Sequence, residues 1–273
     1  MQAEFYDFYE KASDWLRLLA RSEIRIKILA NLNEGVKNLG ELREVLDLSS
    51  STILHGMRGM ELEALIENTA TGYALTNIGK IQTILINDLI KSIAVLSKDR
   101  DFWLNHDISG IPEHLLKRIG ELNDYEFVRS TPEDLLKTMS NYLYLVMKAK
   151  EVKGVSVVFA PQFPSVFKKL VKEKADVQLI LTREVMAKTL ETSRGILESL
   201  IPKPNFRLWE IDEEVKVAFS VTDSFLSFGL LRNDGTYDFD ADLIAHDNEA
   251  LNWARDLFEY YRKRSKMIGL DDI

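Results

Sequence analysis

The chain has 273 residues, of which 46% are hydrophobic and 29% are charged, as in globular proteins, so a disordered or collagen-like chain is excluded. The length exceeds that of a typical domain of about 100–200 residues, which predicts two domains. Lys and Arg number 35 against 43 Asp and Glu, and the net charge of −8 does not suggest nucleic-acid binding, since phosphate binding favours a basic surface. The absence of cysteine excludes disulfides, thiolate metal sites and cysteine nucleophiles.

The N-terminal sequence MQAEFYDFYE lacks the basic start and apolar core of a signal peptide. The longest apolar stretch, residues 81–96, is interrupted by Asn87, Asp88 and Lys91, so no segment reaches the ~20 apolar residues that cross a bilayer. We therefore expect a cytoplasmic protein with no membrane partner.

Residues 1–35 are predicted to be helical, because their apolar residues recur at spacings of three and four. Ser22 is placed to cap a second helix within this region, and Gly35 to end it.

Two short helices are predicted next, one over residues 39–46 capped by Asn38 and one over about 50–63 capped by Ser49 or Ser50. So few residues separate them that the two helices must cross at a steep angle.

A β-hairpin is predicted after these helices, with a strand from Leu65, a turn at Thr71-Gly72 and a return strand through Leu75. This order of elements predicts a winged helix-turn-helix DNA-binding domain over residues 1–80.

In a winged helix-turn-helix the second helix of the pair places its early residues at base edges in the major groove, and the hairpin follows the backbone. His55 and Arg58 lie three positions apart, on one face of that helix. The alternative is that the serine run is only a helix cap and Arg58 a solvated charge. The predicted DNA-binding residues are Ser49, Ser50, Ser51, Thr52, His55, Arg58, Thr69, Thr71 and Tyr73.

Residues 21–80 contain seven basic and eight acidic residues, so one copy should bind DNA weakly and a homodimer is expected. A long apolar-rich helix from Asn77 to about Ser97 is the predicted connector or dimer helix. Residues 81–131 are assigned to connecting and dimerisation helices, with a short helix near Pro112 and otherwise loop.

Residues 132–273 alternate between strand and helix and predict an α/β domain with a mixed sheet. The whole chain is therefore expected to be a two-domain α+β or α/β protein. Thr131-Pro132-Glu133-Asp134 is predicted to start a helix, and three later strands are predicted to form a meander. The predicted strands are 155–159, 177–181, 206–211, 215–221 and 225–231, and the helices are 163–174, 184–200 and 248–264.

Two segments resemble known families. The stretch SEIRIKILANLNEGVKNLGELREVLDLSSSTILHGMRGMELEALIENTATGYALTNIGK is similar to the arsenic-repressor-type winged helix of archaeal transcription regulators, and FSVTDSFLSFGLLRNDGTYDFDADLIAHDNEALNWARDLFEYYRKRS resembles the domain that follows it in the methanogenesis-regulatory group. The resemblance implies a homodimeric, DNA-binding transcription regulator with a C-terminal effector-sensing domain. Metal-sensing members carry cysteines before the recognition helix, and this chain carries none.

Asp238, Asp240, Asp242, His246 and Glu249 have the spacing of a calcium loop, but the glycine that the loop needs is absent. An acidic surface turn is the favoured interpretation. The chain contains no phosphate-binding loop, dinucleotide motif or nucleophile elbow, so neither enzymatic activity, nor a cofactor, nor a metal is expected.

Ligands of open α/β sheets bind beyond the carboxyl ends of the strands. Gln162, Thr182 and Arg183 follow two predicted strands, and an arginine beside helix amides suits an anionic effector. Two alternatives stay open: a winged helix that docks proteins instead of DNA, which the acidic charge favours, and a degenerate enzyme in the second half.

Overall fold

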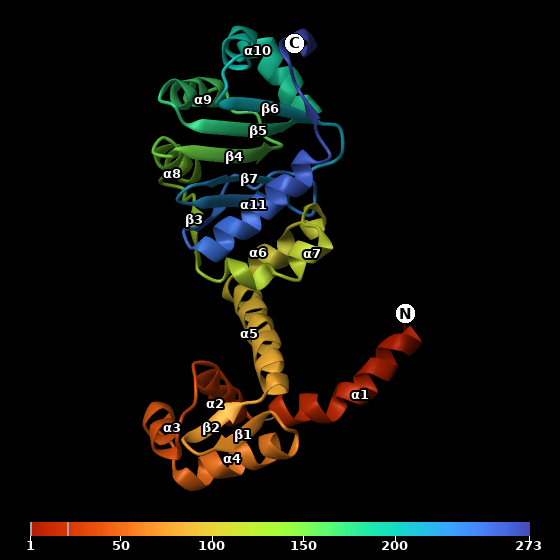
Figure 1. Ribbon diagram of the computed structural model, residues 1–273. Helices are drawn as coiled ribbons and strands as arrows, with labels where there is room; N and C mark the ends of the chain where they lie inside the picture. The colour runs from red at the N-terminus through yellow and green to blue at the C-terminus, as the bar shows by residue number, and fades with distance from the viewer. Residues whose placement is uncertain (1, 21) are drawn as a thin grey trace. The chain divides into compact units, whose positions relative to one another are not determined.

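The computed structural model describes residues 2–20 and 22–273. Met1 and Arg21, which belong to the predicted helical region 1–35, lie outside the described residues. The chain forms two compact units, Met1–Ile90 and Lys91–Ile273. The first is mainly helical and the second contains a mixed sheet (Figure 1).

The first unit is built from short helices followed by a two-stranded antiparallel sheet. Its helix caps form as predicted: the Ser49 hydroxyl accepts the Thr52 amide at 3.2 Å, and Asn38 forms a reciprocal capping box with Glu41. The elements are α1 (Gln2–Ala20), α2 (Glu23–Asn33), α3 (Leu39–Leu46), α4 (Ser50–Leu62), β1 (Ile66–Thr69), β2 (Gly72–Leu75) and the start of α5 (Asn77–Lys98).

The start of α5 lies against the backbone that precedes β1. The Thr76 amide donates to the Leu65 carbonyl at 3.0 Å, and a Cβ atom on Gly79 would lie 1.9 Å from that same carbonyl oxygen. Only glycine therefore fits at position 79.

We expect Gly79→Ala to lower the free energy of unfolding of the first unit by about 3 kcal/mol or more, because backbone must move to admit the methyl group. Urea unfolding followed by far-UV circular dichroism measures the change. Gly195→Ala, where nothing lies within 4 Å of the added Cβ, is the control. Equal effects of the two substitutions would contradict the packing argument.

The second unit contains an eight-stranded sheet in the order β10-β6-β5-β4-β7-β8-β9-β3. β4, β5 and β6 run parallel, and the remaining neighbours pair antiparallel. The strands are β3 (Tyr125–Arg129), β4 (Glu151–Ser156), β5 (Asp176–Thr182), β6 (Phe206–Ile211), β7 (Val217–Thr222), β8 (Leu226–Leu230), β9 (Ala241–Ala245) and β10 (Lys266–Met267).

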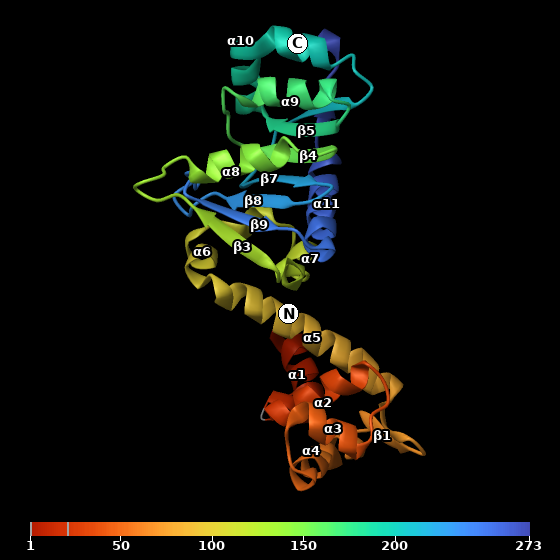
Figure 2. The ribbon, with the colours of Figure 1, turned by 90° about the vertical axis from the view of Figure 1, so that its left-hand side faces the viewer.

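Helices cover both faces of this sheet (Figure 2). α11 (Asn248–Arg262), α6 (Arg100–Asn105) and α7 (Glu113–Leu116) share one apolar core with the sheet, which includes Trp253 and Phe258. α8 (Lys137–Val146), α9 (Phe163–Lys172) and α10 (Arg183–Leu200) share the other, which includes Phe167.

The sheet topology differs from the predicted one. Strand β6 lies parallel beside β5, whereas β7 pairs antiparallel with both β4 and β8. The predicted meander of 206–231 is therefore confirmed for its last two strands and wrong for the first. The predicted strand 155–159 is also displaced, since β4 covers 151–156. Strands β3, β9 and β10 were not predicted.

Two local expectations also fail. Thr131 and Asp134 exchange backbone hydrogen bonds of 3.2 and 3.0 Å, which close a turn and delay the start of α8 to Lys137. Within residues 81–131, expected to be connecting and dimerisation helices, Phe102, Leu115 and Tyr125 belong to the core of the second unit.

Candidate nucleic-acid interface and ligand cavity

Hydroxyl groups at the start of α4 form hydrogen bonds with one another. Ser49 Oγ lies 2.9 Å from Ser51 Oγ and 2.8 Å from Thr52 Oγ1. Ser49 and Ser51 are exposed, and Ser50 and Thr52 are half-buried. Ser49 therefore caps α4, while the exposed side chains of Ser49 and Ser51 remain accessible.

His55 and Arg58 lie one turn further along α4, and both are exposed. Arg58 makes no ion pair with any described residue, whereas Lys27 and Lys37 pair with Glu23 and Glu34. An arginine without a carboxylate partner is free to contact a phosphate or a base edge.

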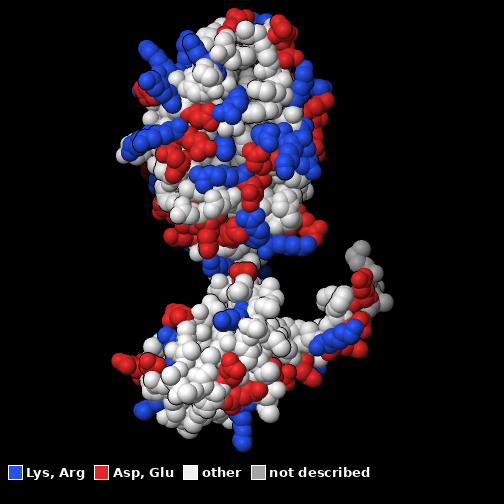
Figure 3. All heavy atoms as spheres, viewed as in Figure 1, with Lys and Arg blue, Asp and Glu red and all other residues white. Residues whose placement is uncertain are grey.

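Arg25 is committed to structure, because its guanidinium donates to the carbonyls of Leu18 at 2.6 Å and Gly56 at 3.4 Å. Between residues 22 and 80, the cations with neither an ion pair nor such backbone contacts are therefore Arg43, Arg58 and Lys80. The face of the first unit in Figure 3 accordingly carries few Lys or Arg side chains.

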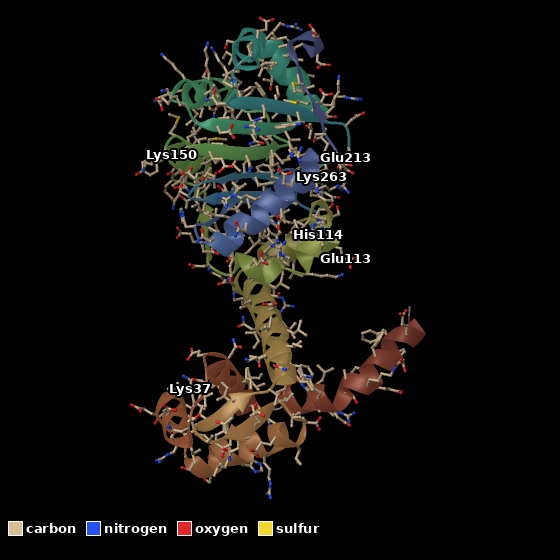
Figure 4. All side chains as sticks on the ribbon, viewed as in Figure 1. Lys37, Glu113, His114, Lys150, Glu213 and Lys263 are labelled. Carbon is tan, nitrogen blue, oxygen red and sulfur yellow. The ribbon has the colours of Figure 1, made fainter. Side chains whose placement is uncertain are left out.

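The hairpin β1–β2 holds two of the predicted residues at its tip. Thr69 Oγ1 donates to the Gly72 carbonyl at 2.7 Å and accepts the Thr71 amide at 3.3 Å. Tyr73 instead exchanges backbone hydrogen bonds with Lys37, labelled in Figure 4, and its half-buried ring packs on the core. Tyr73 therefore helps to stabilise the fold of the first unit.

The predicted effector residues lie in the second unit, after β4 and β5. Thr182 is buried and caps α10, Gln162 is exposed, and Arg183 pairs with Asp212 at 2.5 Å. None of the three predicted residues lines the cavity described next.

A cavity of about 130 Å³ lies in the second unit between the sheet and helices α8 to α10. Most of its lining is apolar, including Met139 of α8, Phe163 and Phe167 of α9, and Leu179 and Leu208 of the sheet. A largely apolar cavity with a few polar groups is typical of small-molecule sites.

Several polar groups of this cavity lie near Asp242 of β9. The Ser227 hydroxyl donates to both carboxyl oxygens at 2.9 Å, and burial raises the pKa of Asp242 to about 7. The Tyr142 hydroxyl lies 3.0 Å from Ser220 Oγ, and burial raises its pKa to about 12. The Tyr237 hydroxyl, whose pKa burial also raises, has no hydrogen-bond partner among the described residues.

Small residues on alternate positions of β7 and β8 make room for the cavity. Ser220 pairs with Ser227 and Ala218 with Gly229, and a Cβ on Gly229 would lie 2.5 Å from the Tyr237 hydroxyl. This period-two alternation of small residues with phenylalanine is the signal that could have located the site from the sequence.

The acidic stretch 238–249 is not the surface turn that we expected, because Asp238 and Asp242 are each 7% exposed. Strand β9 carries Asp242 into the sheet. Asp238 accepts from Arg232 at 2.6 Å and lies 3.0 Å from His106 Nε2. Within 2–20 and 22–273, no group of three or more His, Asp or Glu side chains is placed to hold a metal.

Two regions of the chain match models of known protein domains. Residues 13–94 match the N-terminal domain of the methanogenesis regulatory protein FilR1, and residues 135–264 match its middle domain. Methanogenesis regulatory protein FilR1 of Methanothrix harundinacea (strain 6Ac) is 33% identical over 262 residues, which cover 94% of this chain and 59% of that protein. The chain thus spans about three fifths of this relative.

These matches define the class of protein as a family of regulatory proteins. In particular, the chain contains the N-terminal and middle domains of the methanogenesis regulatory protein FilR1 family.

Solved structures resemble the chain only distantly. TrmBL2, an archaeal chromatin protein, is 14% identical with a TM-score of 0.43, covering 86% of this chain and 89% of that one. NucT from Helicobacter pylori is 13% identical with a TM-score of 0.44, covering 53% and 99%. Similarity at this level says nothing about what the chain binds. Among the described helices, none has the length and apolarity to cross a membrane.

Proposed function

We propose that the protein is a DNA-binding transcription regulator, with a winged helix-turn-helix of the arsenic-repressor type in its first unit. In this proposal α4 is the recognition helix and the β1–β2 hairpin is the wing. Ser49 to Thr52, His55 and Arg58 contact the major groove, and Thr69, Thr71 and Tyr73 lie along the backbone. The observation that carries the proposal is the exposed face of α4, on which Arg58 makes no ion pair with a described carboxylate.

The regulator acts as a homodimer in this proposal, with α5 at the interface. Exposed apolar side chains form one stripe along this helix at spacings of three and four residues, and a second copy would bury them. The stripe consists of Ile78, Ile81, Leu85, Leu89, Ile93 and Leu96. Two copies also make more phosphate contacts than one, which compensates for the near-neutral charge of each DNA-binding unit.

The second unit senses a small molecule, and the cavity beside Asp242 is the favoured effector site. An effector that binds one dimer geometry better shifts the spacing of the two recognition helices and hence the affinity for DNA. Gln162, Thr182 and Arg183 stay a second prediction, for an anionic effector. Effector titration of Arg183→Ala tests it, and unchanged affinity would discard it. Under this proposal the protein is cytoplasmic and is not an enzyme.

Binding to duplex DNA from the region upstream of its own gene tests the proposal. The affinity should fall steeply with salt concentration, because phosphate contacts release counterions. Fluorescence anisotropy at several salt concentrations measures this slope.

We expect Arg58→Ala to weaken DNA binding by about tenfold and to reduce the salt slope by about one if Arg58 contacts a phosphate. Lys27→Ala on α2, whose ammonium pairs with Glu23 at 2.5 Å, is the control and should bind as the native protein does. Equal affinities of all three proteins would remove α4 from the interface.

A protein-docking module is the second candidate, and the net charge of −8 is the observation that favours it. A docking module would show no salt-dependent binding to its own upstream DNA even at low ionic strength. That result would overturn the DNA-binding proposal.

A further inference from the structure

We infer that the cavity of the second unit binds a small primary amine, whose ammonium group pairs with the carboxylate of Asp242. The short apolar body of the amine fills the space among Met139, Phe163 and Leu179. The inference rests on the proposal that the second unit senses a small molecule, and it names the chemical class of that molecule.

The charge of the lining favours a cation. Its ionisable side chains with a negative charge are Asp238 and Asp242, and the described lining contains no Lys, Arg or His. Asp238 is already paired with Arg232 and His106. Asp242 has no cationic partner among the described residues, so an ammonium group would provide the counter-charge that this buried carboxyl lacks.

The hydrogen-bonding capacity around Asp242 also favours a donor. Two donors serve the carboxyl, the Ser227 hydroxyl and the Phe228 backbone amide, although a carboxylate offers about four acceptor positions. Tyr237 lines the same cavity, and its hydroxyl is unpartnered among the described residues. An ammonium group has three donors and can bond both to the carboxylate and to a tyrosine oxygen.

The size of the cavity limits the apolar body. Its volume of about 130 Å³ is close to that of an engineered protein cavity of about 150 Å³ that holds benzene. A body of about five carbon atoms fits, and isoamylamine is therefore the probe. Isoamyl alcohol carries the same apolar body with a neutral head. Isovalerate has the same five-carbon skeleton, with its first carbon as the anionic carboxylate.

Isothermal titration calorimetry of the full chain with these three compounds tests the inference. At pH 8 we expect isoamylamine to bind at least tenfold more tightly than isoamyl alcohol, and isovalerate to show no binding. Asp242→Asn should weaken isoamylamine binding by about 30-fold and abolish the preference for it. Asp124→Asn, which removes an exposed carboxylate outside the cavity, is the charge-matched control and should bind as the native chain does.

The pH dependence is a second readout. Because the free carboxyl must lose its proton to pair with the ammonium group, isoamylamine affinity should fall about tenfold from pH 8 to pH 6. The other titratable groups near Asp242 are Tyr142 and Tyr237. Asp238 lines the same cavity and contacts His106 and Arg232. A dependence that persists in Asp242→Asn would assign the titration to these groups and contradict the role of Asp242.

The outcomes separate this inference from the proposed function. Equal binding of amine and alcohol, tighter binding of isovalerate, or no binding of any probe would overturn the amine. DNA binding, measured on the same preparations without any probe, stands or falls independently. If DNA binding were salt-dependent but isoamylamine did not bind, the proposed regulatory function would stand and only the inferred class of ligand would be wrong.

Discussion

Replacing Leu85 and Leu89 of α5 by glutamate is expected to convert the proposed homodimer into a monomer and to weaken binding to upstream DNA by about 100-fold or more. Their side chains are 60% and 57% exposed, so the fold of one copy does not depend on them. Two glutamates on each of two facing helices would bring four carboxylates into one apolar interface, where their desolvation is costly.

DNA affinity should fall with the loss of the dimer, because one copy keeps only half of the contacts and loses the linked second binding event. Size-exclusion chromatography with light scattering measures the mass, and anisotropy at fixed salt measures the affinity. The double variant Asn87→Glu with Ala94→Glu adds the same charge at exposed positions on the opposite side of α5 and should stay dimeric.

A Leu85→Glu, Leu89→Glu variant that remains a dimer would show that the stripe on α5 is not the interface. A monomer that binds DNA as tightly as the native protein would instead show that dimerisation is not needed for affinity.

Asp242→Asn is expected to make the second unit more stable at pH 8 and to remove a loss of stability between pH 4 and pH 7. Burial raises the pKa of this carboxyl from 3.8 to about 7, so the folded state binds a proton that the unfolded state releases in this range. The stabilising contribution of that proton is complete below about pH 4 and is lost as the pH rises through 7. Ionising the buried carboxyl costs about 4 kcal/mol on this basis.

Asparagine has nearly the shape of the protonated acid and no charge, so the Asp242→Asn variant should lack this dependence. Urea unfolding at pH 5 and pH 8, followed by tryptophan fluorescence, measures the difference, since Trp103, Trp209 and Trp253 belong to the second unit. Asp107, held by Lys216 at a pKa of about 2, titrates below this window. If the free energy of unfolding changed equally between pH 5 and pH 8 in the native protein and in the Asp242→Asn variant, Asp242 would ionise without a cost in stability.

The helices of the first unit could be predicted because their signals are local. Ser22, Asn38 and Ser49 each accept an amide within three residues, and this geometry needs no information from the rest of the chain. The long helix α5 was predicted for the same reason, from the spacing of its apolar residues alone.

The sheet order was decided by contacts between distant segments. Residues 206–211 could pair with β7 or with β5, and local patterns do not distinguish these partners. The placement of β6 beside β5 buries Trp209 and Ile211 against α11, and this gain depends on a helix 40 residues further along the chain.

The ligand cavity also could not be predicted from local sequence patterns, because tertiary contacts form it. The acidic residues of 238–249 are visible in the sequence, but their spacing is as typical of an exposed turn as of a strand. The pairing of β9 with β8 and β3 carries Asp242 beneath α8, beside Ser227 and Tyr142. Whether a carboxylate is buried depends on which other segments of the chain pack over it. Only the tertiary structure therefore shows that Asp242 is buried and that its charge lacks a partner within the described part of the chain.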